Sequence, residues 1–192
     1  MKRFLASLIV LCVVILLYVA KADAASLNDF TITSYDINYR LSNDEDNRSV
    51  LKTTEKITAV FPDIDQNHGI ERAIPKSYDE HSISLSIKAV EDERGNKLPY
   101  TTYESNGNEV VRIGDADKYV HGAQTYVIRY DQRDVTRFFS DINNDEFYWD
   151  TNGTDWKVPI QNLSVNLEID SDVRQKLNGN SACYQGIAGS SQ

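Results

Sequence analysis

The sequence is poor in the residues and patterns from which many functional sites are built. Its 192 residues include only three histidines and two cysteines, none of them at the spacing of transition-metal sites. It has no Gly-x-Ser-x-Gly motif, no P-loop and no dinucleotide-binding fingerprint. No stretch keeps a helical periodicity for long. We therefore expect no metal, no cofactor and a fold that is not helical.

Basic residues are scarce relative to acidic ones. The chain has 20 lysines and arginines against 29 aspartates and glutamates, which gives a formal net charge of −9. Nucleic acids and anionic lipids are bound by clustered basic side chains. The sequence shows no basic patch, so its composition argues against either as a partner.

What the sequence does contain begins with an export signal. Lys2 and Arg3 precede an apolar run over residues 4–20, and Ala22-Asp23-Ala24 has the small-x-small pattern of a cleavage site. This anatomy predicts that residues 1–24 are a signal peptide. Cleavage removes three basic residues and one acidic residue, which changes the net charge from −9 to −11. The alternative is an uncleaved membrane anchor, because the apolar run is near the length needed to span a bilayer.

The following residues alternate between apolar and polar side chains over short stretches. In residues 31–41, Tyr35, Ile37 and Tyr39 share one face, as in a half-buried antiparallel strand. Similar stretches between turn signals predict further strands at residues 50–61, 82–90, 98–103, 109–113 and 125–130. The pattern predicts an all-β domain over residues 25–170, an antiparallel β-sandwich of about eight strands.

Both tryptophans lie within residues 146–159, on either side of the turn signal Asn152-Gly153. This stretch is interpreted as a β-hairpin, with a second strand that runs on to Ile169 and a β-bulge near residues 161–162. Large aromatic side chains dominate core energetics, so the hairpin is expected to anchor the core. Its expected core residues are Phe147, Trp149, Trp156 and Pro159.

Glu55 stands on the apolar face of the strand predicted at residues 50–61. A carboxylate in the core must be paired or protonated, because burying a lone charge costs several kcal/mol. Arg72, in the mostly apolar segment 70–75, is the expected partner and could bind the carboxylate bidentately. We expect this ion pair to be structural; the alternative is a functional site.

Other carboxylates allow an enzymatic interpretation. Asp145, Glu146, Asp150 and Asp155 lie near the tryptophans, and paired carboxylates beside aromatics are found in glycosidases. The other interpretation is solvated charges on a turn. Residues 141–145 also place oxygen ligands at alternate positions, as an EF-hand does, but the glycine and the final glutamate of that loop are missing.

Residues 171–192 form a Gly/Ser-rich tail that contains Cys183. Removal of the signal peptide takes away the other cysteine, Cys12. A lone cysteine in an exported protein suggests a missing disulfide partner or a reactive thiol. We take Cys183 as a disulfide candidate and the chain as a fragment whose second cysteine lies beyond Gln192.

Several stretches come together in an order that resembles a known family. They are Thr54-Glu55, the run Gly69-Ile70-Glu71-Arg72-Ala73-Ile74-Pro75, Arg112-Ile113-Gly114, Gly122 with Thr125-Tyr126 and Tyr130, and Glu146-Phe147-Tyr148-Trp149 with Gly153, Trp156 and Val158-Pro159-Ile160. Together they resemble the N-terminal extracytoplasmic domain of the YciQ-like predicted membrane proteins, a domain of unknown function.

This resemblance implies a β-sandwich outside the membrane that is followed by transmembrane helices. It also implies a second cysteine soon after the Cys-Tyr-x-Gly segment that begins at Cys183. Two features depart from the family pattern: no transmembrane segment follows in this chain, and Asp170-Ser171 replaces the proline that commonly closes the last strand. The family offers no established catalytic residue to carry over.

The sequence thus predicts a non-enzymatic, exported ectodomain on the extracytoplasmic side of the cell membrane, attached through a downstream segment, or secreted if the chain ends at Gln192. We expect it to bind or sense another protein or an envelope component. Aromatic residues in loops are the natural contacts if they stay exposed: Phe138, Phe139, Tyr148 and Trp149. The alternatives are an envelope glycan hydrolase that uses the four carboxylates and a structural spacer.

Overall fold

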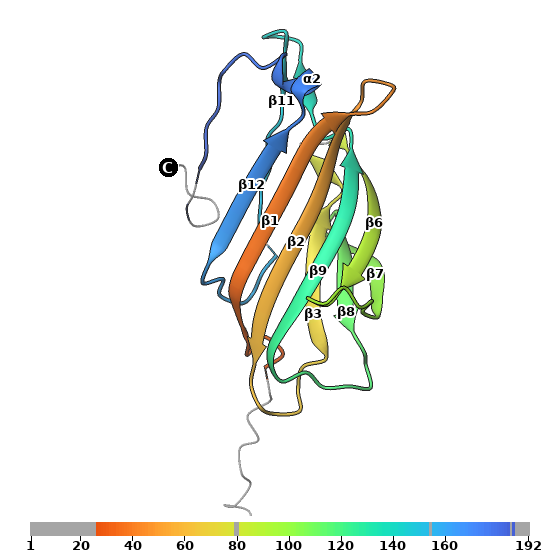
Figure 1. Ribbon diagram of the computed structural model, residues 1–192, viewed down its shortest axis with the longest axis vertical. Helices are drawn as coiled ribbons and strands as arrows, with labels where there is room; N and C mark the ends of the chain where they lie inside the picture. The colour runs from red at the N-terminus through yellow and green to blue at the C-terminus, as the bar shows by residue number, and fades with distance from the viewer. Residues whose placement is uncertain (1–25, 79–80, 154, 185, 187–192) are drawn as a thin grey trace, which may run out of the picture.

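The computed structural model describes residues 26–78, 81–153, 155–184 and 186, so the predicted signal peptide lies outside the described residues. Two sheets form most of the domain, and Figure 1 shows the second packed behind the first. The first sheet contains β12 (Leu163–Ile169), β1 (Thr31–Asn43), β2 (Ser49–Phe61), β9 (Gly122–Arg133) and β6 (Ser84–Glu91), in that order. The second contains β3 (Gly69–Pro75), β8 (Asn108–Gly114) and β7 (Tyr100–Ser105). The predicted all-β sandwich is confirmed.

Short elements complete the described part of the chain. Two small antiparallel pairs join β4 (Ser77–Tyr78) to β5 (His81–Ser82) and β10 (Arg137–Phe139) to β11 (Asn144–Glu146). The four-residue helix α2 (Ser171–Arg174) follows β12. In Figure 1, α2 and β11 lie at the upper end of the sandwich.

The strands β1, β2 and β9 form the centre of the first sheet. Their apolar side chains alternate with polar ones, so every second residue points into the core. The antiparallel register places Tyr35 beside Ile57 and Ile57 beside Tyr126 on that inner face. Burial of these aromatic and branched side chains provides the main driving force for folding.

The hairpin predicted at residues 146–159 is wrong. β11 ends at Glu146 and pairs with β10, and the chain then runs without regular strand structure until β12. β12 pairs with β1 in parallel, with Tyr35 opposite Leu163. Parallel neighbours require a long connection between them. We call its last part, residues 147–162 between β11 and β12, the crossover. The turn signal at Asn152-Gly153 lies inside this crossover and not between two paired strands.

The predicted bulge near residues 161–162 is also wrong. Ile32 bridges Ile160 and Tyr35 pairs with Leu163, so this part of the chain keeps one register against β1. The register shift occurs instead where β1 pairs with β2, between Ile32 and Ser34. Buried Ile32 and Tyr35 are three residues apart in β1, and their partners Ile160 and Leu163 are three residues apart as well, so the apolar side chains change phase in step with β1.

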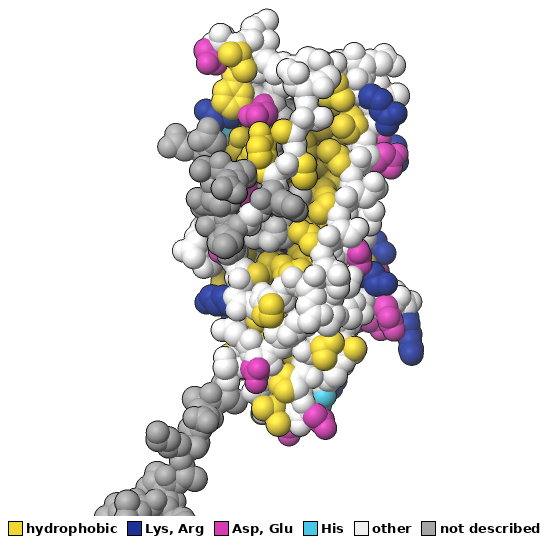
Figure 2. Space-filling view, turned by 90° about the vertical axis from the view of Figure 1, so that its left-hand side faces the viewer, with side chains coloured by type: hydrophobic (Ala, Val, Ile, Leu, Met, Phe, Trp, Pro, Cys, Tyr) yellow, Lys and Arg dark blue, Asp and Glu magenta, His cyan; other side chains and the backbone are white. Residues whose placement is uncertain are grey.

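The side of the sandwich at β12 is only partly covered. The side chains of Leu163, Val165 and Leu167 are 44%, 42% and 42% exposed, although their strand partners in β1 are buried in the core. Figure 2 shows a band of hydrophobic side chains along this side of the molecule. The three-stranded second sheet is narrower than the five-stranded first sheet, so it does not extend beneath β12.

Two glycines allow β3 and β8 to meet closely at one end of the second sheet. Gly69 and Gly114 are cross-strand partners with φ angles of +144° and +141°. A Cβ on Gly69 would lie 1.9 Å from the carbonyl oxygen of Ile113, and one on Gly114 would lie 1.8 Å from that of His68. Any other residue would push the two backbones apart.

We expect Gly114→Ala to lower the free energy of unfolding by more than about 3 kcal/mol, because both the φ angle and the backbone contact oppose a side chain. Gly95→Ala is the matched control: its φ is +83°, but nothing lies within 4 Å of the added Cβ. Gly95→Ala should lower the free energy of unfolding by the backbone strain alone, about 1–2 kcal/mol. Guanidinium unfolding measures both, and equal losses would contradict the close approach.

Candidate functional site

The structure brings Glu55 and Arg72 together at the centre of the domain. The Arg72 Nε donates to Glu55 Oε2 at 2.9 Å and its Nη2 donates to Oε1 at 2.8 Å, so the contact is bidentate. The two side chains are 0% and 3% exposed. Tyr130 donates its hydroxyl to Glu55 Oε1 at 2.7 Å, and Arg72 Nη1 donates to the carbonyl of Ala73. The pair joins β2 of the first sheet to β3 of the second.

Buried tyrosines surround this ion pair. Burial raises the pKa of Tyr35 and of Tyr130 well above the ordinary value for tyrosine. Burial alone would lower the pKa of Arg72, but the Glu55 carboxylate outweighs it and holds that pKa well above its usual value. The pair is therefore enclosed and satisfied by hydrogen bonds, and we infer a structural role for it.

The segment that was expected to form the hairpin packs beside the ion pair. Phe147, Trp149 and Trp156 are half-buried against the core, and the rings of Tyr35 and Trp156 meet edge-on at 6.0 Å between centroids. Tyr39 donates its hydroxyl to the carbonyl of Thr151 at 3.0 Å. A Cβ on Gly153 would lie 3.1 Å from Arg72 Nη1. These contacts place the crossover directly over the guanidinium.

Pro159, the fourth residue assigned to the hairpin core, is exposed. Its carbonyl accepts a hydrogen bond from the backbone N–H of Ile32 at 3.0 Å. It therefore attaches the crossover to β1 through the backbone rather than by packing of its ring. A core position for this proline was wrong.

The four carboxylates considered for catalysis are all exposed. Asp145 and Glu146 are neighbours in β11, and Asp155 accepts a hydrogen bond from Asn108 Nδ2 at 2.8 Å. Within the described ranges, no group of three or more histidine, cysteine, aspartate or glutamate side chains could hold a metal ion. Because adjacent residues of a strand point to opposite faces, Asp145 and Glu146 do not face one common substrate.

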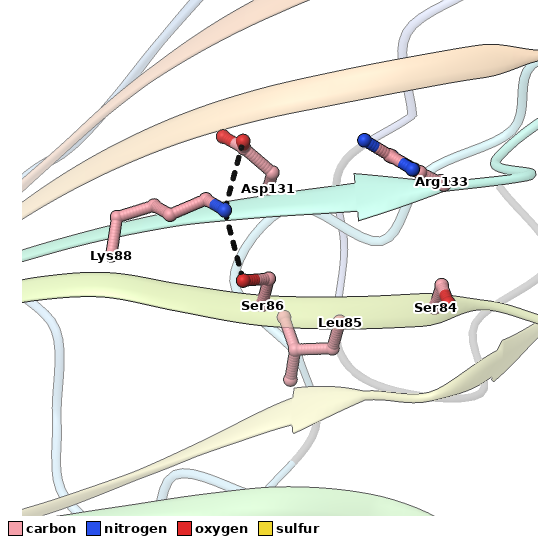
Figure 3. Close-up of a pocket in the computed structure, with 6 residues that line it drawn as sticks. All are labelled: Ser84, Leu85, Ser86, Lys88, Asp131 and Arg133. Carbon is pink, nitrogen blue, oxygen red and sulfur yellow. Dashed lines mark hydrogen bonds and ion pairs between the residues drawn. The ribbon is translucent and has the colours of Figure 1, made fainter.

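A first recess, of about 250 Å³, lies on the outer face of the first sheet between β6 and β9 (Figure 3). Its lysine already has two partners: Lys88 Nζ lies 2.9 Å from Ser86 Oγ and 3.5 Å from Asp131 Oδ2. Arg133 stands apart from this group at the end of β9 in Figure 3. Serine, leucine and charged side chains line the recess, and it has no aromatic wall.

A second recess, of about 290 Å³, lies against the second sheet. Tyr103 of β7, Ala73 of β3 and Val110 of β8 line it together with the segment 155–157. The sequence does not predict this recess, because its residues come from four separate parts of the chain. The one feature of the sequence that could have indicated a recess is the presence of two short side chains, Ala73 and Val110, within strands, since short side chains leave space above a sheet.

Large apolar side chains are exposed around the β10–β11 pair. Phe138 is 57% exposed, Ile142 is 65% exposed and Tyr148 is 48% exposed. Tyr148 stacks on Tyr78 with 5.6 Å between ring centroids. We call this group the apolar end. Of the four aromatic residues expected as contacts, Phe138 and Tyr148 are exposed, whereas Phe139 and Trp149 are half-buried.

Cys183 is exposed and forms no disulfide within the described part of the chain. Its pairing with a cysteine beyond Gln192 stays a prediction. Among the residues that the structure describes, no helix is both long and apolar enough to cross a membrane.

We expect Glu55→Gln to lower the free energy of unfolding by about 3–5 kcal/mol, because it leaves the buried Arg72 charge without its counter-ion. Guanidinium unfolding measures the loss. The matched control is Glu71→Gln, which breaks the exposed pair with Arg112 and should cost less than about 1 kcal/mol. An unchanged stability of the Glu55 variant would rule out the pair as a source of stability.

We also expect the protein to lose stability above about pH 10, the ordinary pKa of tyrosine. Burial raises the pKa of the four tyrosines buried in the core: Tyr35, Tyr39, Tyr126 and Tyr130. Above pH ~10 the unfolded chain loses protons that the folded chain keeps, so each such tyrosine lowers the stability by up to about 1.4 kcal/mol per pH unit.

Guanidinium unfolding over a pH series measures this slope. Tyr126→Phe should make it shallower by the contribution of one tyrosine, because burial is the cause of the raised pKa of Tyr126. A free energy of unfolding that stays constant above about pH 10 would show that these hydroxyls ionise without unfolding.

Solved structures share only part of this architecture. Leukotriene A4 hydrolase from Saccharomyces cerevisiae is 12% identical with a TM-score of 0.37, over 59% of this chain and 17% of that one. An M1 zinc metallopeptidase from Deinococcus radiodurans is 10% identical with a TM-score of 0.39, over 77% of this chain and 36% of that one. This chain thus spans a minor part of either enzyme, and similarity at this level carries no conclusion about activity.

No curated protein matches the chain. One family model does: the predicted membrane protein (DUF2207) N-terminal domain matches residues 31–183, which include every strand of both main sheets. The resemblance drawn from the ordered motifs agrees with this match. The protein therefore belongs to the family of predicted membrane proteins that is defined by the DUF2207 N-terminal domain, a domain of unknown function.

Proposed function

We propose that this domain is a non-enzymatic binding or sensing module on the extracytoplasmic side of the membrane. Its family of predicted membrane proteins and the signal peptide expected at residues 1–24 support this location. A net charge of −11 after cleavage keeps such a domain soluble and away from anionic lipid. The partner is a protein or another component of the cell envelope.

The observation that carries the proposal is the apolar end. Phe138, Ile142 and Tyr148 expose about half or more of their surface within one small region around a short strand pair. Scattered apolar residues need no explanation, but grouped aromatic and aliphatic side chains are typical of protein interfaces. Stacking of Tyr148 on Tyr78 reduces the entropy lost when a partner orders these side chains.

Photo-crosslinking in the organism that makes the protein tests this role. We expect p-benzoylphenylalanine at Phe138 or Ile142 to give a discrete adduct of the complete protein, because a partner covers these side chains. The control position is Tyr119, an exposed aromatic residue in the connection before β9, at the opposite end of that strand from Phe138.

A second substitution makes the test specific. With the crosslinker at Phe138, the change Ile142→Asp should reduce the adduct at least tenfold, since a charge in an apolar contact is desolvated without compensation. The same pattern of adducts from Phe138, Ile142 and Tyr119 would contradict the proposal.

A further inference from the structure

The second recess has a floor of small side chains on the outer face of the second sheet. Ala73, Val110 and Tyr103 are neighbours across β3, β8 and β7. Because the first two side chains are short and the third is large, the surface is hollow beside the tyrosine ring. The segment Asp155–Lys157 lines another side of the hollow, which measures about 290 Å³.

The walls of this recess are held in place before any ligand binds. The Tyr103 hydroxyl donates to Glu71 Oε2 at 3.1 Å, and Arg112 Nε donates to Glu71 Oε1 at 2.6 Å. The Arg112 guanidinium also lies 5.0 Å from the centre of the Tyr103 ring. On the other side, the bond from Asn108 to Asp155 fastens the crossover to β8. Ligand binding would therefore lose little entropy, because these side chains are already ordered.

Polar groups of both hydrogen-bonding types line the same recess. Ser105 and Asn106 can donate and accept, Asp155 can accept and Lys157 can donate. Trp156 also lines it, and its Nε1 is buried without a hydrogen-bond partner among the described residues. Opposite charges are mixed here, so the recess has no strong field of one sign to select a cation or an anion.

We propose that this recess binds one neutral sugar ring of a glycan. A pyranose presents an apolar face of C–H groups, which suits Ala73, Val110 and the Tyr103 ring, and a rim of hydroxyls, which suits the surrounding donors and acceptors. The volume lies at the lower end of the range for ligand pockets, which limits the occupant to about one ring. The first recess offers no comparable aromatic wall.

This glycan site is separate from the apolar end and does not depend on the partner proposed there. Its residues belong to β3, β7, β8, the turn between β7 and β8 and the segment 155–157, whereas Phe138, Ile142 and Tyr148 of the apolar end lie in or beside β10 and β11. Glycan binding and partner binding can thus be lost one at a time.

Titration of the intact protein with glucose, galactose, mannose and N-acetylglucosamine tests the proposal. Binding is followed by tryptophan fluorescence in the Trp149→Phe variant, so that the signal comes from Trp156 in the recess. We expect at least one of these sugars to give a saturable change, because the ring occupies the space beside the indole.

Two variants and a control connect the signal to this site. Ala73→Leu fills the hollow from its floor, and Tyr103→Ala removes its aromatic wall; each should weaken the affinity at least tenfold. Tyr100→Ala removes an exposed tyrosine from the same strand outside the recess and should leave the affinity unchanged. Circular dichroism checks that each variant is folded.

Three results would overturn the proposal. One is no saturable change with any of the four sugars up to their solubility limits. Another is wild-type affinity in both Ala73→Leu and Tyr103→Ala. The third is competition by an acetylated tripeptide as effective as that by the sugar, which would assign the recess to peptide side chains instead. Loss of crosslinking at Phe138 has no bearing on these outcomes.

Discussion

The buried contact between Glu55 and Arg72 joins the two sheets at the centre of the domain. Hydrophobic burial drives the layers together but has no preferred direction, whereas a bidentate ion pair fixes both distance and orientation. Since one partner belongs to β2 and the other to β3, the pair aligns the middle of the first sheet with the edge of the second. Tyr130 of β9 donates a further hydrogen bond to the Glu55 carboxylate. Gly153 has no side chain, so the crossover can pass close to the Arg72 guanidinium.

Much of the fold follows from local rules that can be applied to the sequence. Alternation in residues 31–41 and 50–61 identifies β1 and β2, because a half-buried strand must place every second side chain in the core. Glu55 could be given a partner because a charge on an apolar face requires one. Residues 69–75 were harder to assign: Pro75 ends the segment, yet it is tolerated because β3 is an edge strand.

The rest depended on contacts that local rules do not describe. Asn152-Gly153 is a turn signal, but it does not say which strands the turn joins, and here the chain crosses over to pair in parallel with β1. The recess on the second sheet combines short side chains of β3 and β8 with Tyr103 and the crossover, so it exists only once the sheets are assembled. The apolar end is similar, because packing decides that Phe138 is exposed whereas Phe139 is half-buried.

The parallel pairing of β1 with β12 gives the domain a particular response to mechanical force. β1 is the first long strand and β12 the last, and their seven matched pairs run from Tyr35–Leu163 to Leu41–Ile169. Tension between Phe30 and Asp170 therefore pulls the two strands past each other along their length. The hydrogen bonds of this parallel ladder lie across the direction of pull, so they share the load. A domain held by its tail and pulled through its first strand resists extension as one unit.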